Sequence, residues 1–244
     1  MSIRITGLTS LPEVRRGDDI ARLIREAAGR ERQAISANSI VVVAQKIVSK
    51  AEGAVVDLGA VVPSALAKAW AAQCGRDERL VELILRQSRR IVKMDRGVLI
   101  AETHHGFITA NAGVDQSNVA EPRHATVLPA DPDASARRIH EALECGAVIL
   151  SDTFGRPWRE GLVNVAIGVS GLAPLEDHRG SIDRAGRLLQ GTVVALADEL
   201  AAAAGLVMPK AGGVPVALIS GVSWRRDEGS ARQLIRPPER DLFR

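Results

Sequence analysis

Two short stretches of the sequence carry residue types that suit a metal ion. Residues 111–118 read NAGVDQSN and residues 151–159 read SDTFGRPWR. In each, an aspartate follows an apolar run and is surrounded by hydroxyl, amide or glycine residues. We expect Asp115 and Asp152 to meet at strand ends, with Thr153 adding an oxygen, and to hold Mg²⁺ or Mn²⁺, which favour oxygen ligands. The alternative is that each aspartate organises a turn by accepting backbone N–H bonds.

Two lysines follow the apolar run SIVVVA, in the segment QKIVSK. Lys46 and Lys50 could contact phosphates through their ammonium groups. Neither GxxxxGK[ST] nor GxGxxG occurs in the sequence, so the two common nucleotide fingerprints do not support this interpretation. The alternative is a pair of solvated lysines where the strand ends.

Other polar or reactive residues indicate structural roles. His104 and His105 lack the HExxH spacing of a metal site, which favours a structural or surface role. Cys74 and Cys145 are isolated, without CxxC spacing, and are expected to be buried small hydrophobes in a reducing cytoplasm. The stretch EDHRGSIDRAGR (176–187) could present charges to a ligand, or its Asp183 could cap a following helix.

Composition narrows the class of protein. Of 244 residues, 46% are hydrophobic but only 2% are aromatic, so the core must be aliphatic and base-stacking platforms are scarce. The net charge of +3 comes from arginines spread along the chain, which suits small anionic ligands at least as well as a polymer, and with so few aromatic residues we expect no nucleic-acid partner. No uninterrupted apolar run reaches the roughly 18 residues of a membrane span, so we expect a cytoplasmic protein.

Helical and strand patterns alternate irregularly along the chain. An N-terminal loop precedes a helix capped by Asp18, and further helices are expected to open at Pro63 and Asp77 and to cover 131–145 and 181–205. Strands are expected at 39–45, 54–58, 90–93, 98–103, 107–110, 126–129, 147–152, 164–171 and 215–220, and a surface tail from 223 onward. The irregular order predicts a mixed α/β (α+β) fold without a strict βαβ repeat.

Six stretches together resemble one family, the coenzyme F-420-0: L-glutamate (gamma-glutamyl) ligases. The resemblance runs in uninterrupted order from about residue 7 onward. The stretches are SLPEVRRGDDIARLI, VVVAQKIVSKAEG, HHGFITANAGVDQSNV, SDTFGRPWREGLVNVAIGVSG, DHRGSIDRAGRLLQGTVVALADELA and LIRPPERDLF.

The resemblance implies an enzyme that uses GTP and Mg²⁺ or Mn²⁺, with K⁺ as a further candidate ion. It implies addition of L-glutamate, first directly and then through gamma links, to the deazaflavin precursor F-420-0 through an acyl phosphate. It also implies a homodimer with a family-specific fold that is neither Rossmann nor P-loop. Residues 1–244 would form one ligase unit, or two intertwined subdomains, without a C-terminal flavin-binding domain.

By position, the resemblance assigns roles to particular residues. Asp115, Asp152 and Thr153 match metal ligands, and Asp115, Asp152, Lys46 and Lys50 match catalytic residues. The residues that match GTP contacts are Leu11, Pro12, Glu13, Val14, Gln45, Lys46, Lys50 and Asn118, with the loop Met208, Pro209, Lys210, Ala211, Gly212 and Gly213.

The sequence departs from the family pattern in this last loop. Lys210 stands where an acidic or amide metal ligand is common, Pro209 replaces a glycine, and Ser220 replaces an arginine. A charged lysine cannot ligate a metal. Lys210 therefore contacts phosphate, or other groups hold a second metal.

Two other functions would use the same aspartates. A metal-dependent phosphohydrolase would cleave the nucleotide without needing glutamate, and a non-catalytic regulator would bind it without turnover. Glutamate-stimulated phosphate release separates all three.

Overall fold

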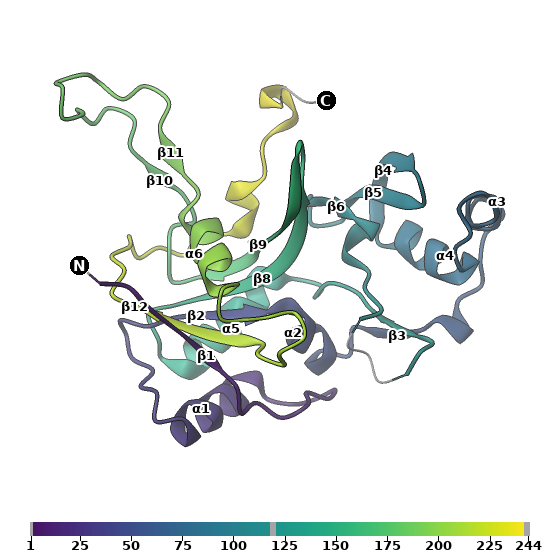
Figure 1. Cartoon of the computed structure of the whole chain (residues 1–244), viewed down its shortest axis with the longest axis horizontal. Helices are drawn as coiled ribbons and strands as arrows, with labels where there is room; N and C mark the ends of the chain where they lie inside the picture. Colours follow the sequence, from purple (N-terminus) through teal and green to yellow (C-terminus); the bar gives the residue numbers. More distant parts are fainter. Residues whose placement is uncertain (1, 118–120, 242–244) are drawn as a thin grey trace.

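A five-stranded mixed sheet forms the centre of the protein in a computed structural model that describes residues 2–117 and 121–241 (Figure 1). The strand order is β1-β12-β2-β8-β9, where β2 and β8 are parallel and the other pairs are antiparallel. The strands are β1 (Arg4–Leu8), β12 (Val216–Ser220), β2 (Ile40–Ala44), β8 (Ala147–Arg156) and β9 (Arg159–Ser170). The predicted mixed α/β fold is confirmed.

Continuous apolar runs place the sheet in the main hydrophobic core. The four residues 40–43 and the four residues 147–150 are all fully buried, as expected for strands covered on both faces. Helix α5 packs on β8 and β9, α1 packs on α5, and α6 packs on β9. The helices around this sheet are α1 (Ile20–Arg30), α2 (Gln45–Ala51), α5 (Pro132–Leu143) and α6 (Leu196–Ala204).

A second hydrophobic core lies under the two helices α3 and α4. The side chains of Ser64 and Asp77 accept backbone N–H bonds in the first turns of α3 and α4. This confirms the helix start predicted at Asp77, whereas the helix predicted from Pro63 begins at Ala65, with Ser64 as its N-cap. The elements of this core are α3 (Ala65–Cys74), α4 (Glu78–Arg86), the sheet β4 (Ser88–Asp95), β5 (Val98–Thr103) and β6 (Ile108–Ala110), and the pair β3 (Val55–Asp57) and β7 (His124–Thr126).

The predicted helix over 181–205 is wrong for most of its length. Only α6 is helical, and the residues before it form an arm that stands away from the body, with β10 (Glu176–Asp177) paired to β11 (Val193–Val194) (Figure 1). Gly180 and Gly186 adopt left-handed φ angles that end a helix. Asp183 accepts the N–H groups of Ala185 and Arg187 in a turn, and caps no helix.

Four other boundaries differ from the predictions. Strand β1 was not predicted, and Asp19, not Asp18, caps α1. Lys46 and Lys50 lie on helix α2 and not in a polar connection. The strand expected at 126–129 ends at Thr126. Short 3₁₀ turns occupy Leu58–Ala60, Asn111–Gly113, Ala231–Leu234 and Pro238–Arg240.

The tail after residue 223 is largely exposed but docks on α5 through polar contacts. Ser230 Oγ donates to Asp133 Oδ2 at 2.6 Å, and the Ala231 N–H donates to Asp133 Oδ1 at 3.0 Å. Within residues 2–117 and 121–241, no helix is both long and apolar enough to cross a membrane.

Candidate functional site

The segment before Asp115 is a run of left-handed backbone. Asn111, Ala112 and Gly113 have φ angles of 54°, 51° and 73°. Such conformations cost energy for residues other than glycine and persist only where the surroundings enforce them. Here Arg76 Nη1 donates to Asn111 Oδ1 and to the Gly97 carbonyl, both at 2.9 Å. The NAG residues therefore re-aim the chain so that the next residues reach the site.

Asp115 both organises a turn and pairs with a lysine. Its Oδ1 accepts the Ser117 N–H at 2.7 Å, as the alternative interpretation predicts. Its Oδ2 accepts Lys46 Nζ at 2.6 Å and Ser117 Oγ at 2.8 Å. Burial alone would raise the pKa of Asp115, but the hydrogen bonds from Lys46 and Ser117 outweigh it and lower the pKa. Asp115 is therefore held as a carboxylate.

Lys46 uses all three of its donors. Besides Asp115, its Nζ donates to the Ser117 carbonyl at 2.9 Å and to Ser117 Oγ at 2.6 Å. The lysine is not the solvated side chain that the alternative interpretation expects, because its side chain is only 18% exposed. The ammonium group is fixed beside the aspartate before any ligand binds.

Asp152 lies inside β8, and not after its end as predicted. Pairing of β2 with β8 stops at Ala44 and Ser151, so Asp152 is the first β8 residue beyond that pairing. Gln45 follows Ala44 and hydrogen-bonds the Asp152 carboxyl group. The buried Ser49 Oγ lies 2.8 Å from Gln45 Oε1 and 2.7 Å from the Val127 carbonyl, and with Oε1 on the Ser49 side the Gln45 amide N–H₂ faces Asp152.

Burial raises the pKa of Asp152, and the nearby Asp115 charge raises it further. Bonds from the Thr153 N–H and Gln45, together with the charge of Lys210, act in the opposite direction but do not cancel burial. The structure thus brings the two predicted aspartates close enough for the charge of one to affect the pKa of the other. Asp152 is the one whose charge is poorly compensated.

Thr153, Asn164 and Lys210 form a connected polar group beside the aspartates. Thr153 Oγ1 donates to Asn164 Oδ1 at 2.9 Å across the β8–β9 pair, and Lys210 Nζ contacts Thr153 Oγ1. Burial lowers the pKa of Lys210, while the Asp152 and Asp115 charges oppose that shift. Lys210 is the one residue of the 208–213 loop with a described side-chain hydrogen bond to this group.

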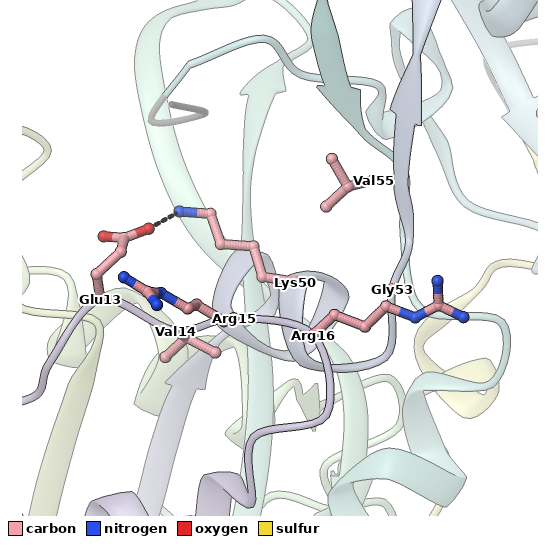
Figure 2. Close-up of a pocket in the computed structure, with 7 residues that line it drawn as sticks. All are labelled: Glu13, Val14, Arg15, Arg16, Lys50, Gly53 and Val55. Carbon is pink, nitrogen blue, oxygen red and sulfur yellow. Dashed lines mark hydrogen bonds and ion pairs between the residues drawn. The ribbon is translucent and has the colours of Figure 1, made fainter. Parts of the chain in front are cut away.

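A cavity of about 410 Å³ lies beside helix α2 (Figure 2). On one side Lys50 Nζ pairs with Glu13 Oε1 at 2.5 Å. Arg16 extends over Gly53, where an added Cβ atom would come within 2.8 Å of Arg16 Nε. Three cations and one carboxylate suit an anionic ligand. The lining residues are Glu13, Val14, Arg15, Arg16, Lys50, Gly53 and Val55.

Some predicted contact residues point into the protein. Val14 and Met208 are buried in the main core, and Leu11 packs against it, so they can offer a ligand little beyond backbone groups. Pro12, Pro209, Ala211, Gly212 and Gly213 lie in loops at the surface or close to it. Asn118 is outside the described residues.

The histidines and one cysteine have the structural roles that were predicted. His104 Nε2 lies 2.9 Å from the Arg86 carbonyl and His105 Nε2 lies 2.9 Å from the Pro129 carbonyl. Cys145 is buried, and burial raises the pKa of its thiol to about 11. Cys74 is only half-buried.

The family model of F420-0:Gamma-glutamyl ligase matches residues 9–221. The chain belongs to this family. The matched region contains Lys46, Asp115, Asp152 and Lys210, so the whole polar site lies within the F420-0:gamma-glutamyl ligase region.

Relatives are similar over most or all of their length. A coenzyme F420:L-glutamate ligase of Methanothermobacter thermautotrophicus is 46% identical over 252 residues, which cover all of both chains. One of Methanopyrus kandleri is 45% identical over 254 residues, covering all of this chain and 98% of the relative. One of Methanocaldococcus jannaschii is 44% identical over 216 residues, or 86% of each chain.

The donor set in this family member fits a divalent cation. Among the described residues, no three His, Cys, Asp or Glu side chains gather in a way that could hold a metal ion. Mg²⁺, however, is often bound by one or two carboxylates, with waters and phosphates completing its shell. Asp152, buried and with a raised pKa, is a carboxylate that a cation would stabilise.

Sequence reasoning missed several residues of the site. Ser117 and Asn164 orient Asp115 and Thr153, and Arg15 and Arg16 line the cavity. The Ser117 contact was readable from the Asx-turn spacing Asp-x-Ser. The Arg15–Arg16 pair directly after LPEV was also visible as local charge. No local pattern marks Asn164, which meets Thr153 only through strand pairing.

Proposed function

We propose that this chain is a GTP-dependent ligase that adds L-glutamate to the deazaflavin precursor F-420-0, first directly and then through gamma links. The observation that carries the proposal is the family match over residues 9–221, together with relatives named coenzyme F420:L-glutamate ligase that align over 98% or more of their length. The geometry supports it, because Lys46, Asp115 and Asp152 form one charged cluster within that region.

The proposed reaction has two steps. A carboxylate oxygen of the precursor attacks the γ-phosphorus of GTP, the bond to the β,γ-bridging oxygen breaks, and GDP leaves with that electron pair. The glutamate amine then attacks the acyl carbon, the C–N bond forms, the acyl C–O bond breaks, and phosphate leaves while the amine loses a proton. The first step depends mainly on positioning and on stabilising charge.

The residues of the cluster have separate tasks in this proposal. Lys46, fixed by Asp115 and Ser117, presents positive charge to the transferring phosphoryl group. Asp115 and Asp152, with Thr153, would hold Mg²⁺ or Mn²⁺, which supplies positive charge for the phosphate oxygens. Gln45 holds the Asp152 carboxyl group in place from the start of α2.

The nucleotide is proposed to lie along α2 towards the cavity of Figure 2. Its loop contacts would come from residues 11–14, and Lys50 would exchange Glu13 for a phosphate oxygen. K⁺ is proposed as an additional ion. A homodimer is also proposed, and the arm between β10 and β11 supports it, because Ile182 and Leu188 at its tip are 71% and 59% exposed.

Mass spectrometry of the precursor after incubation with enzyme, GTP, L-glutamate and Mn²⁺ tests the function. Increments of one glutamate residue that require every component are expected. GTP hydrolysis without any increment would instead indicate a phosphohydrolase, and binding without turnover a regulator. Light scattering of the purified chain, compared with a variant carrying Ile182→Ser and Leu188→Ser, tests the dimer.

A further inference from the structure

The side chain of Lys210 extends from its loop to the side-chain oxygens of Thr153 and Asn164. The loop connects α6 to β12, and its Lys210 Nζ donates to Thr153 Oγ1 and lies 3.4 Å from Asn164 Oδ1. Thr153 Oγ1 in turn donates to Asn164 Oδ1 at 2.9 Å. An ammonium group therefore occupies a position surrounded by a hydroxyl oxygen and an amide oxygen, which are also the oxygens that a divalent cation accepts.

The charges around this position balance without any ion. Lys210 interacts electrostatically with Asp152, Asp115 and Lys46. Two carboxylates and two ammonium groups carry no net charge together. One divalent cation would give the cluster a charge of +2, whereas a second cation beside Thr153 would lie next to the Lys210 ammonium group and be repelled by it.

We propose that the ammonium group of Lys210 takes the place of a second divalent cation beside Thr153, so that this chain binds a single Mg²⁺ or Mn²⁺ through Asp115 and Asp152, while Thr153 serves as a partner of Lys210 and not as a ligand of that ion. The inference rests on the metal-dependent ligase proposed above. It makes Lys210 a residue that determines metal stoichiometry. A neutral side chain at 210 frees the Thr153 and Asn164 oxygens and removes one repulsive charge.

The test counts Mn²⁺ ions bound to the full-length chain by electron paramagnetic resonance of free Mn²⁺, with saturating guanosine 5′-(β,γ-imido)triphosphate. The wild type is compared with Lys210→Asn, Lys210→Asp and the charge-conserving Lys210→Arg. Lys68→Asn, on the exposed face of α3, is the matched control for loss of a lysine. Thermal unfolding of each variant checks that the fold is retained.

We expect one Mn²⁺ per chain for the wild type, Lys210→Arg and Lys68→Asn. Lys210→Asn and Lys210→Asp should bind two, with the dissociation constant of the second ion lowered about tenfold or more relative to the wild type. Two ions in the wild type, or the same count in all variants, would overturn the inference.

A direct phosphate contact gives a different result. In that case Lys210→Asn weakens binding of the nucleotide analogue at saturating Mn²⁺ and leaves the ion count unchanged, which also overturns the inference. Glutamate addition by the wild type is measured in parallel. If addition persists while the ion counts contradict the inference, only the role of Lys210 fails, whereas absence of addition and of Mn²⁺ binding removes the proposed function as well.

Discussion

The two aspartates of the site occupy opposite environments. Asp115 sits at a turn where Lys46 and Ser117 donate to both of its oxygens, and its pKa is lowered. Asp152 sits in the sheet, where burial raises its pKa and only an amide, a backbone N–H and a more distant lysine oppose that. One carboxylate is compensated by the protein itself, whereas the other is left to be compensated by something that binds.

This difference separates stability from function. A compensated carboxylate contributes to the folded state, because removal of its charge leaves a lysine without its partner. A buried, uncompensated carboxylate lowers the stability of the folded protein. Such a carboxylate is retained only where it serves a function. Substitutions of the two aspartates should therefore agree in their effect on activity and differ in their effect on stability.

The largest expected effects are those on activity, and Asp152→Asn is the first test of them. Glutamate addition should fall about 10³-fold, as for loss of a central electrostatic contact. At the same time the free energy of unfolding of the ligand-free protein should rise by about 1 kcal/mol, because a buried charge is removed. Initial rates and urea unfolding at pH 7 measure both. An unchanged rate, or a loss of stability, contradicts the comparison.

Gly113→Ala tests the backbone that supports the Asp115 side. Its φ of +73° is left-handed, and an added Cβ atom would lie 2.7 Å from Leu128 Cγ. We expect a loss of about 2–3 kcal/mol in unfolding free energy. Gly29→Ala in α1, where an added Cβ meets nothing within 4 Å, is the matched control and should be neutral or slightly stabilising. Equal effects of the two substitutions would argue against a constrained turn.

Asp115→Asn should lower the unfolding free energy by about 1 kcal/mol, opposite in sign to Asp152→Asn. The cause is the loss of the Lys46 ion pair, so the double variant Lys46→Gln with Asp115→Asn should lose less than the sum of the single variants. Chemical denaturation of the three variants measures this coupling. Metal-dependent GTP cleavage should also be lost in Asp115→Asn, and retained turnover would remove Asp115 from the site.

Glu82 lies outside the site and can be compared with Asp115, because its carboxylate charge is also stabilised by groups of the protein itself. Hydrogen bonds from the Ser64 hydroxyl and N–H, with Arg86, lower the pKa of Glu82 to about 2. Its contribution is present above the ordinary pKa of 4.5 and is lost as the pH falls towards 2. Glu82→Gln should cost about 1 kcal/mol at pH 7 and less at pH 3.5. A cost that does not change with pH would refute this account.

Local sequence was enough to predict those helices and strands whose apolar or helix-start pattern matches their position in the fold. The run IVVVA predicted a buried strand, Asp77 predicted the start of α4, and Pro63 placed the start of α3 two residues too early, because strand burial and helix starts depend on neighbouring residues. The helix predicted from apolar spacing is wrong over 181–195, because Gly180 and Gly186 adopt left-handed φ angles there and the chain forms an arm away from the body.

The sequence by itself determined which chemical groups the protein has and which family it resembles. The tertiary structure decided which of those groups meet. Lys46 and Asp115 are 69 residues apart, and Lys210 and Thr153 are 57 apart. Residue spacing carries no information about such contacts. They depend on the register of β2 with β8, on the left-handed run before Asp115, and on how far packing excludes water from each charge.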